Sequence, residues 1–370
     1  LAAYFFDSKE LVLIRDRFGV KPLYFFNDDS GFSFASEIKG LLPFMRRREL
    51  DPLAVVRHQQ FVWNPAAQTA IKGVVKVRPG EMIIVNHAGW RSVKWYKPSF
   101  SRSGAVPAYR DAEDQLRDCV SGAVRRQLVS DVNVGVFLSG GLDSSAVSYA
   151  AKEYAGPLPA FTVNTVGGVS EGDTDDLPYA RLVAKRLGLP LHEVQIKDSD
   201  LADGLVSMVW NLDEPLSDPA PLNVLRICEA ARHQGVKVMM SGAGGDDLFT
   251  GYRRHSVLNA FGGMRWGAKN ALRAAAFGYA KGTARRRKLE KAAYICSARS
   301  LSDFVVRAFE WVPYEGLSRY VSSEVLECID PDEIAEPLHN TLLQVDSTDP
   351  VDLALALEEC HFLPDHNLCY

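Results

Sequence analysis

The stretch VFLSGGLDSS, residues 136–145, joins the end of a strand to a glycine loop and the start of a helix. Apolar residues at every second position mark the strand and share one of its faces. They are Val132, Val134, Val136 and Leu138. Gly140 and Gly141 allow a sharp turn and a close approach to a ligand. Ser144 and Ser145 lie where the helix should begin, and free amides at a helix N-terminus bind anions. The stretch therefore predicts a pyrophosphate-binding loop.

This loop is not a Walker A motif, because no Lys-Ser/Thr pair follows the glycines. Without that lysine, transfer of a γ-phosphoryl group is disfavoured. A loop that holds the β- and γ-phosphates as a leaving group exposes the α-phosphorus to attack. Asp143 is acidic beside a polyphosphate, which requires Mg²⁺ between the two. The alternative is an ordinary strand–turn–helix without a ligand.

A second strand and loop occur at VKVMMSGAGGDDLFTGYRRH, where residues 236–240 form the strand. The loop supplies glycines and the adjacent acids Asp246 and Asp247. In a parallel sheet both loops emerge at the carboxyl edge, where ligands bind. We expect them to share one nucleotide and its metal ion. By itself, the second loop could also be a helix cap.

The chain of 370 residues is long enough for two domains. Residues 1–97 are β-rich, and a linker rich in Ser, Pro and Gly follows at 98–110. Residues 111–370 alternate strands with helices and become helical after about residue 250, which predicts a doubly wound parallel sheet with a helical C-terminal part. The predicted class is α/β.

The net charge of −4 argues against general binding to nucleic acid or acidic membranes. The basic runs at 46–48 and 285–288 are more simply solvated helix faces than anion sites. None of the six cysteines forms a CxxC pair, and no signal peptide or membrane-length apolar run occurs. These features predict a cytoplasmic protein.

At the two loops the sequence resembles the glutamine-dependent asparagine synthetase family. LSGGLDSS resembles the family's pyrophosphate loop, and SGAGGDDLFTGY resembles its SGEGxDExFxGY segment. RDRFGVKPLYFF and FASEIKGLL resemble the latter half of its N-terminal nucleophile-hydrolase glutaminase domain. DEPLSDPA and FLPDHNL resemble its ATP-pyrophosphatase synthetase domain.

The resemblance implies amidation of aspartate to asparagine through β-aspartyl-AMP, with ATP and Mg²⁺ as cofactors and ammonia from glutamine. Aspartate, glutamine or ammonia, and ATP would be the partners, and a homodimer is possible. It implies that the pyrophosphate is held by Ser139, Gly140, Gly141, Asp143, Ser144 and Ser145. It places Asp143 and Asp246 on magnesium, and Leu138, Val163, Ser241 and Gly242 against the adenosine.

Three departures from the family pattern follow. The family's catalytic N-terminal cysteine is absent, since residue 1 is Leu1 and the first cysteine is Cys119. Ala243 stands where the family has a glutamate, so either a neighbour such as Asp247 compensates or the acceptor site has diverged. The expected catalytic residues are Asp143, Asp246 and Asp247. A family lysine beyond the C-terminus is also absent, so we expect a piece cut at both ends. Residues 213–215 are expected near the nucleotide pocket or in a plain turn.

The alanine at position 243 keeps two other functions open. An enzyme of the same scaffold could amidate another carboxylate, such as a sugar acid of a surface polysaccharide or a peptide. A catalytically silent subunit could use the fold for assembly alone, although such a protein has no need of intact pyrophosphate-binding residues.

Overall fold

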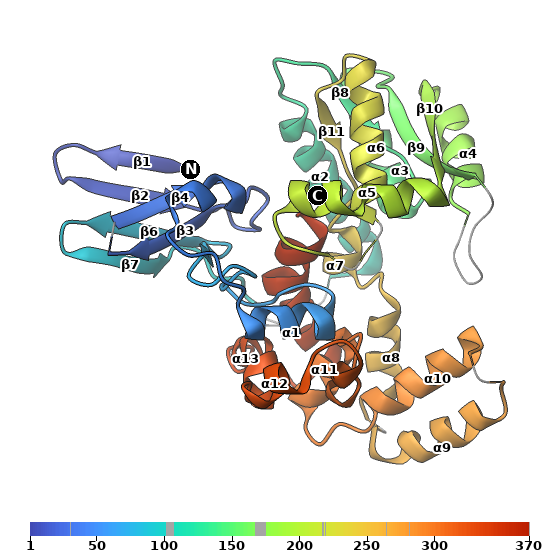
Figure 1. Cartoon of the computed structure of the whole chain (residues 1–370). Coiled ribbons are helices and arrows are strands. Elements are labelled where there is room, and N and C mark those ends of the chain that lie inside the picture. Colours follow the sequence, from blue (N-terminus) through green and yellow to red (C-terminus); the bar gives the residue numbers. More distant parts are fainter. Residues whose placement is uncertain are drawn as a thin grey trace. The chain divides into compact units, whose positions relative to one another are not determined.

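The computed structural model describes residues 1–29, 31–100, 107–166, 175–216, 218, 220–263, 265–280 and 282–369. Residues 101–106 of the predicted linker lie outside this part. The chain forms two compact units (Figure 1). The composite unit comprises Leu1–Ser101, Val209–Ser217 and Asp247–Cys369. The parallel-sheet unit comprises Arg102–Met208 and Asp218–Asp246.

The N-terminal part of the composite unit consists of two antiparallel sheets. One sheet has the order β1-β2-β6-β7, formed by Ala2–Phe5, Glu10–Ile14, Glu81–Asn86 and Gly89–Lys94. The other has the order β4-β3-β5, formed by Gly31–Ala35, Tyr24–Asp28 and Val75–Lys76. Apolar side chains of both sheets form one buried cluster that includes Leu13, Phe25 and Ile83. These two sheets confirm the predicted β-rich character. Alternation of apolar and polar residues along the strands gives each sheet one apolar face.

Helix α1, Pro52–Phe61, interrupts this β-rich stretch, which the sequence pattern did not predict. It begins where the Asp51 side chain accepts hydrogen bonds from Leu53 N and Ala54 N. Pro52 occupies the first helical position, where its missing N–H costs nothing. α13 (Pro331–Leu342) and α14 (Pro350–Leu357) also start with a capping Asp followed by Pro.

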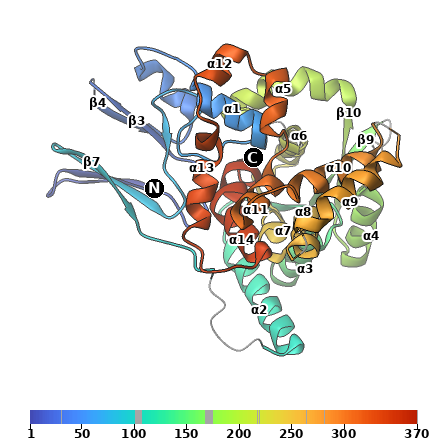
Figure 2. The same cartoon turned by 90° about the horizontal axis from the view of Figure 1, so that it is seen from below.

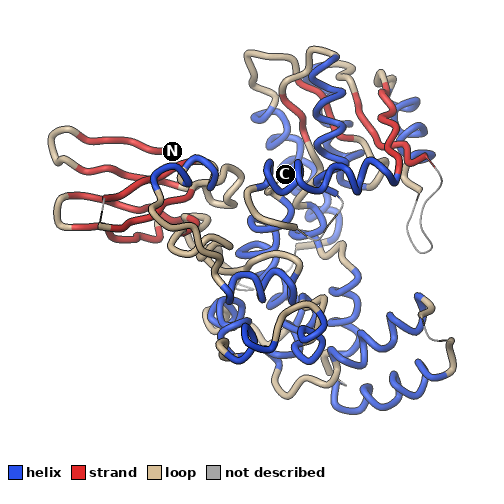
Figure 3. The backbone as a smooth tube through the Cα atoms, in the orientation of Figure 1, coloured by secondary structure: helices blue, strands red, loops and turns tan. Residues whose placement is uncertain are grey.

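Residues 247–369 of the composite unit are helical, as the blue segments in Figure 3 show. Besides α13 and α14, the helices are α8 (Arg253–Phe261), α9 (Arg265–Phe277), α10 (Ala284–Ile295), α11 (Leu301–Phe309), α12 (Ser323–Glu327), a 3-10 helix at Tyr314–Arg319 and a π-helix at Glu358–Asn367. α1 lies beside α13 (Figure 2). Arg57 fixes that contact by donating to the carbonyls of Glu333 (2.7 Å) and Ile334 (3.2 Å).

The parallel-sheet unit contains four parallel strands in the order β10-β9-β8-β11. The strands are Leu191–Lys197, Ala160–Val166, Val134–Phe137 and Val238–Met240. α2 (Tyr109–Gln127), α3 (Leu142–Ala155) and α4 (Leu177–Leu187) cover one face through a cluster that includes Val136 and Ala151. α6 (Ala220–His233) covers the other face through Ile227 and Phe161. Helices on both faces confirm the predicted α/β class with a doubly wound sheet.

Candidate nucleotide site

The site lies at the carboxyl edge of the parallel sheet, where the strand order reverses. β8 is the first strand in the chain order of this sheet, and its two neighbours are β9 and β11. β8 and β11 are parallel neighbours, so their carboxyl ends lie side by side. The two glycine loops follow these two strands: the first loop is residues 138–141, and the second is residues 241–244. The sequence prediction that both loops meet at one edge is thus confirmed.

The first loop takes the conformation that its glycines permit. Gly140 has a φ of +81°, and a β-carbon there would overlap the backbone of Tyr179 and Ala180 at the start of α4. Ser144 Oγ lies 2.9 Å from Ser139 Oγ and 3.2 Å from the Gly141 carbonyl. Within the described residues, no side chain caps the N-terminus of α3, so its first amides are available to an anion.

Ser145 adds a second polar group to this helix start. Its Oγ is buried and has no hydrogen-bond partner within the described part of the chain. A buried hydroxyl without a partner is costly, so a ligand oxygen would satisfy it. The group fits the phosphate that the sequence predicts here.

The second loop packs directly on the first. A β-carbon on Gly242 would lie 2.6 Å from Ser144 N and 2.8 Å from the Asp143 carbonyl carbon. A β-carbon on Gly245 would overlap the carboxylate of Asp143. Ala243 N donates to Ser241 Oγ at 3.0 Å, which tightens the turn. Gly242 is therefore required for the loops to meet at this distance, whereas Gly245 leaves room for the present position of the Asp143 carboxylate.

Asp143 and Asp246 are the acids that this contact brings into one electrostatic environment. Burial raises the pKa of Asp143, and the negative charge of Asp246 raises it further. A cation between two carboxylates would remove that repulsion. Within the described residues, no group of three or more His, Cys, Asp or Glu side chains could hold a metal. Two carboxylates completed by phosphate oxygens and water are nevertheless a normal Mg²⁺ donor set, so the residues fit this ion.

A cavity of about 520 Å³ opens beside the first loop at the ends of β8 and β9. Leu138, Ser139 and Val163, which the family resemblance associates with ATP, line it. Its remaining walls include residues that sequence reasoning did not assign to a site: Phe137, Phe161, Asn223 and Ile227. Asp175 and Asp176 line it as well. Its volume lies in the range of small-molecule sites.

Asp247 has different surroundings from its neighbour Asp246. It is fully buried in the composite unit, where its carboxylate accepts from Tyr252 Oη (3.1 Å) and Asn367 Nδ2 (3.0 Å). Burial and the charge of Glu358 raise the pKa of Asp247 to about 6. Consecutive residues of a helix point about 100° apart. The proposed compensating role of Asp247 remains a prediction.

Residues 213–215 are more than a plain turn. Asp213 has a φ of +65° and accepts from Ile38 N (2.6 Å) and from Lys39 Nζ (2.9 Å). Glu214 accepts from Ala70 N (2.8 Å) and lies 3.6 Å from Lys76 Nζ. Both carboxylates thus bind the N-terminal part of the composite unit. Neither is among the described residues that line the cavity beside the first loop.

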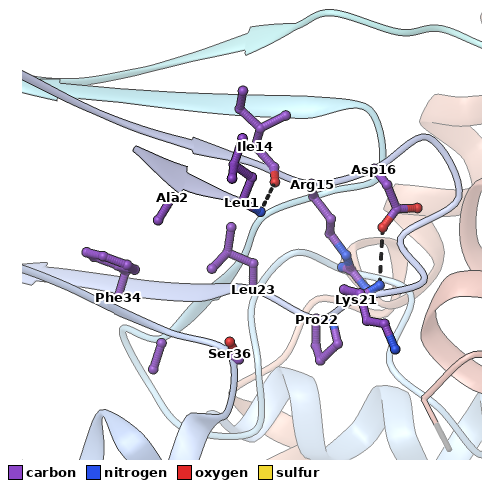
Figure 4. Close-up of a pocket in the computed structure, with 11 residues that line it drawn as sticks. Leu1, Ala2, Ile14, Arg15, Asp16, Lys21, Pro22, Leu23, Phe34 and Ser36 are labelled. Atoms are coloured by element: carbon purple, nitrogen blue, oxygen red, sulfur yellow. Dashed lines mark hydrogen bonds between the residues drawn. The ribbon is translucent and has the colours of Figure 1, made fainter. Parts of the chain in front are cut away.

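A second cavity, of about 500 Å³, lies in the composite unit between β1, β2 and β4 (Figure 4). Leu1, Ile14, Lys21 and Phe34 are among its walls. Backbone pairing shapes it, since the Leu1 ammonium donates to the Ile14 carbonyl at 2.8 Å. No predicted site residue lies in this cavity.

Comparison with known proteins decides the family. Residues 115–368 match the model of the asparagine synthase family, and residues 1–96 match that of the glutamine amidotransferase domain. The chain belongs to the asparagine synthase family. The proposed identification at the two loops is therefore confirmed at the level of the family.

Curated members of the asparagine synthase family align with about two thirds of the chain. Asparagine synthetase [glutamine-hydrolyzing] 1 of Bacillus subtilis is 33% identical over 243 residues, 64% of this chain and 37% of that protein. A putative asparagine synthetase [glutamine-hydrolyzing] 2 of Methanocaldococcus jannaschii is 30% identical over 263 residues, which cover 68% of this chain and 49% of that protein. Amidase chry2 of Gibberella zeae is 31% identical over 263 residues, which cover 66% of this chain and 38% of that protein. The chain thus spans less than half the length of these relatives.

Among solved structures, the NMN synthetase of Francisella tularensis covers 70% of this chain and 97% of its own, with a TM-score of 0.30 and 14% identity. The NH3-dependent NAD synthetase of Campylobacter jejuni gives a TM-score of 0.27 at 14% identity. Likenesses this low carry no argument about function. Across the described helices, none combines the length and apolar character needed to cross a membrane.

Proposed function

We propose that this chain binds Mg-ATP at the carboxyl edge of its parallel sheet and uses it to adenylate a carboxylate, which ammonia then converts to an amide. The observation that carries the proposal is the contact between the two glycine loops. It brings Asp143 beside Gly245 and into the field of Asp246, at the start of a helix with open amides. This arrangement suits a polyphosphate and its cation.

The first amides of α3, with Ser139, Gly140, Gly141, Ser144 and Ser145, would hold the β- and γ-phosphates. The carboxylate oxygen of the acceptor attacks the α-phosphorus, and the bond from that phosphorus to the β-phosphate oxygen breaks. Pyrophosphate leaves with the electron pair and stays on the helix N-terminus, which favours negative charge. Mg²⁺ on Asp143 and Asp246, when bound, would neutralise charge that develops on these oxygens.

In the second step, ammonia attacks the acyl carbon, AMP departs with the electron pair of the acyl–oxygen bond, and one proton is lost from nitrogen. We propose aspartate as the acceptor and asparagine as the product, with glutamine as the source of ammonia. The proposed division of the chain assigns 1–97 to the glutaminase domain, 98–110 to a linker and 111–370 to the synthetase domain. Leu138, Val163, Ser241 and Gly242 would contact the adenosine of ATP.

Ala243 supports one competing acceptor class. An alanine can neither coordinate a metal nor exchange a proton, so the acceptor site differs from the family pattern at this position. A sugar acid or a peptide carboxylate is the alternative substrate. The six cysteines are free, in keeping with the cytoplasm as the proposed compartment. A homodimer is also proposed, and light scattering of the purified protein tests it.

The decisive experiment measures pyrophosphate release with Mg-ATP, ammonium chloride and a panel of carboxylates. Ammonium bypasses the need for glutamine hydrolysis. Release that depends on aspartate, with asparagine and AMP formed in equal amounts, supports the proposal. Release with another acid alone favours the alternative acceptor. Calorimetry that detects no binding of Mg-ATP at millimolar concentration overturns the proposal in favour of a catalytically silent subunit.

A further inference from the structure

The cavity at the ends of β8 and β9 contains a polar side chain that the proposed chemistry does not use. Asn223 lies in the first turn of α6, and it lines the cavity together with Ile227, one turn further along the same helix face. Ile227 is buried in the cluster that includes Phe161 and Val236. It thereby fixes the helix against the sheet, and Asn223 is held half-buried at the cavity wall.

Two other polar side chains of the cavity, Asn164 and Asp175, already have partners. Asn164 Nδ2 donates to Glu193 Oε2 at 3.1 Å, and Arg181 Nη2 donates to the same oxygen at 2.7 Å. Asp175 Oδ1 accepts from Leu177 N at 3.2 Å. The amide of Asn223 has no such partner within the described residues, so its donor and its acceptor are both available to a ligand.

Charge decides which part of a nucleotide lies near Asn223. Asp175 and Asp176 line the same cavity, and burial together with the charge of Asp175 raises the pKa of Asp176. Phosphates are repelled by this acidic pair and attracted to the helix start beside Ser139. The uncharged base and sugar therefore occupy the part of the cavity away from the first loop.

We propose that Asn223 reads the base edge of the nucleotide and selects adenine over guanine, an inference that rests on the proposed binding of ATP. A planar amide donates and accepts in one plane, which matches the amino group and ring nitrogen of adenine. Guanine presents two acceptors on the corresponding edge, so one of the two hydrogen bonds is lost. The amide of Asn223 is thus a specificity determinant for the base.

The test compares the dissociation constants of Mg-ATP and Mg-GTP for the wild-type chain and for Asn223→Ala, by calorimetry. Asn223→Leu serves as a second variant, because it keeps the volume and removes both hydrogen bonds. Asn270→Ala is the matched control, since Asn270 is exposed on a helix of the composite unit. The wild type should prefer ATP by roughly tenfold or more, the range of one bidentate amide–adenine pair. Either Asn223 variant should bring the ratio toward one by weakening ATP alone.

An unchanged ATP-to-GTP ratio in both folded variants overturns the inference and leaves the proposed function intact. A wild-type chain that binds neither nucleotide overturns the proposed function, and the inference with it. Equal weakening of both nucleotides also overturns the inference, because it indicates a general loss of cavity shape instead of base selection.

Discussion

The carboxylate of Asp143 rests against the backbone of Gly245, so closely that a β-carbon at position 245 would overlap it. Asp143 is the second residue of the helix after the first loop, and Gly245 is the first residue of the helix after the second loop. The contact makes the position of the carboxylate proposed to bind the metal ion depend on a glycine more than a hundred residues away in sequence.

Gly245→Ala should displace the carboxylate of Asp143 and weaken Mg-ATP binding by at least about tenfold, or about 1.4 kcal/mol. Calorimetry measures the loss. Gly263→Ala is the control, because a β-carbon there meets no atom within 4 Å and its φ is not left-handed. Unchanged affinity in a folded Gly245→Ala protein would contradict a role of this contact in nucleotide binding.

Gly140→Ala should destabilise the fold by about 1–3 kcal/mol, because it combines a strained φ with overlap against Tyr179 and Ala180. Chemical denaturation gives the free energy of unfolding. Gly188→Ala separates the two causes, since Gly188 has a φ of +63° but open space around it. Equal losses in the two variants would show that backbone strain alone is responsible.

Glu214→Gln should lower the free energy of unfolding by about 3–5 kcal/mol, because it leaves the buried Lys76 with one partner fewer. Glu49→Gln removes a comparable pair with Lys72 on the surface and should cost less than about 1 kcal/mol. Chemical denaturation at pH 7 measures the free energy of unfolding of both variants and of the wild type. A loss as small as that of Glu49→Gln would mean that Asp365 compensates for the missing charge.

We also expect the stabilisation by Glu214 to depend on pH. Burial alone would raise the pKa of Glu214, but the charges of Lys76 and His58 lower it below its ordinary value. A carboxyl with a lowered pKa stabilises the fold above its unfolded pKa of about 4.3. That contribution disappears as the pH falls through the folded pKa. The stability gap between wild type and Glu214→Gln should therefore be full at pH 6 and shrink below pH 4.

Asp247→Asn should stabilise the protein above pH 6. The raised pKa of about 6 means that the folded state holds this proton more tightly than the unfolded chain, so ionisation of Asp247 reduces stability as the pH rises from about 4 to 6. Asparagine keeps an acceptor for Tyr252 and Asn367 without the charge. We expect a gain of roughly 1–3 kcal/mol at pH 8 and little at pH 4.

Thermal unfolding at pH 4 and pH 8 checks this difference, with Asp131→Asn at an exposed position as the control. A destabilised variant at pH 8 would contradict the electrostatic argument. The same protein addresses the predicted catalytic role, since loss of pyrophosphate release in a more stable variant would mean that Asp247 serves the chemistry at the expense of the fold.

Local patterns in the sequence predicted the parallel sheet and the meeting of the two loops. Alternating apolar residues define β8, and glycines mark both loops, because strand period and turn geometry are encoded within a few residues. The start of α1 also has a local pattern, because Asp51-Pro52 before an apolar run is typical of a helix N-terminus. This helix was not predicted, since the surrounding residues show a β-strand pattern.

The remaining parts of the site depend on contacts between distant segments. Asn223 reaches the cavity only because α6 crosses over the sheet, and Asp213 finds Lys39 far away in sequence. Asp246 and Asp247 look equivalent in the sequence, yet the direction of each side chain depends on helix phase and on tertiary packing. No periodicity contains this information.

The composite unit also has a consequence for biosynthesis. Arg57 and Lys76 leave the ribosome early, but Arg57 binds the carbonyls of Glu333 and Ile334, and Lys76 is buried beside Glu214 and Asp365. These partners are translated much later. The contacts of Arg57 and Lys76 can therefore form only after the last third of the chain has been made, whereas residues 102–246 already contain all four strands of the parallel sheet. During vectorial synthesis the strands of the middle segment are thus complete before the buried charges of the first segment find their partners.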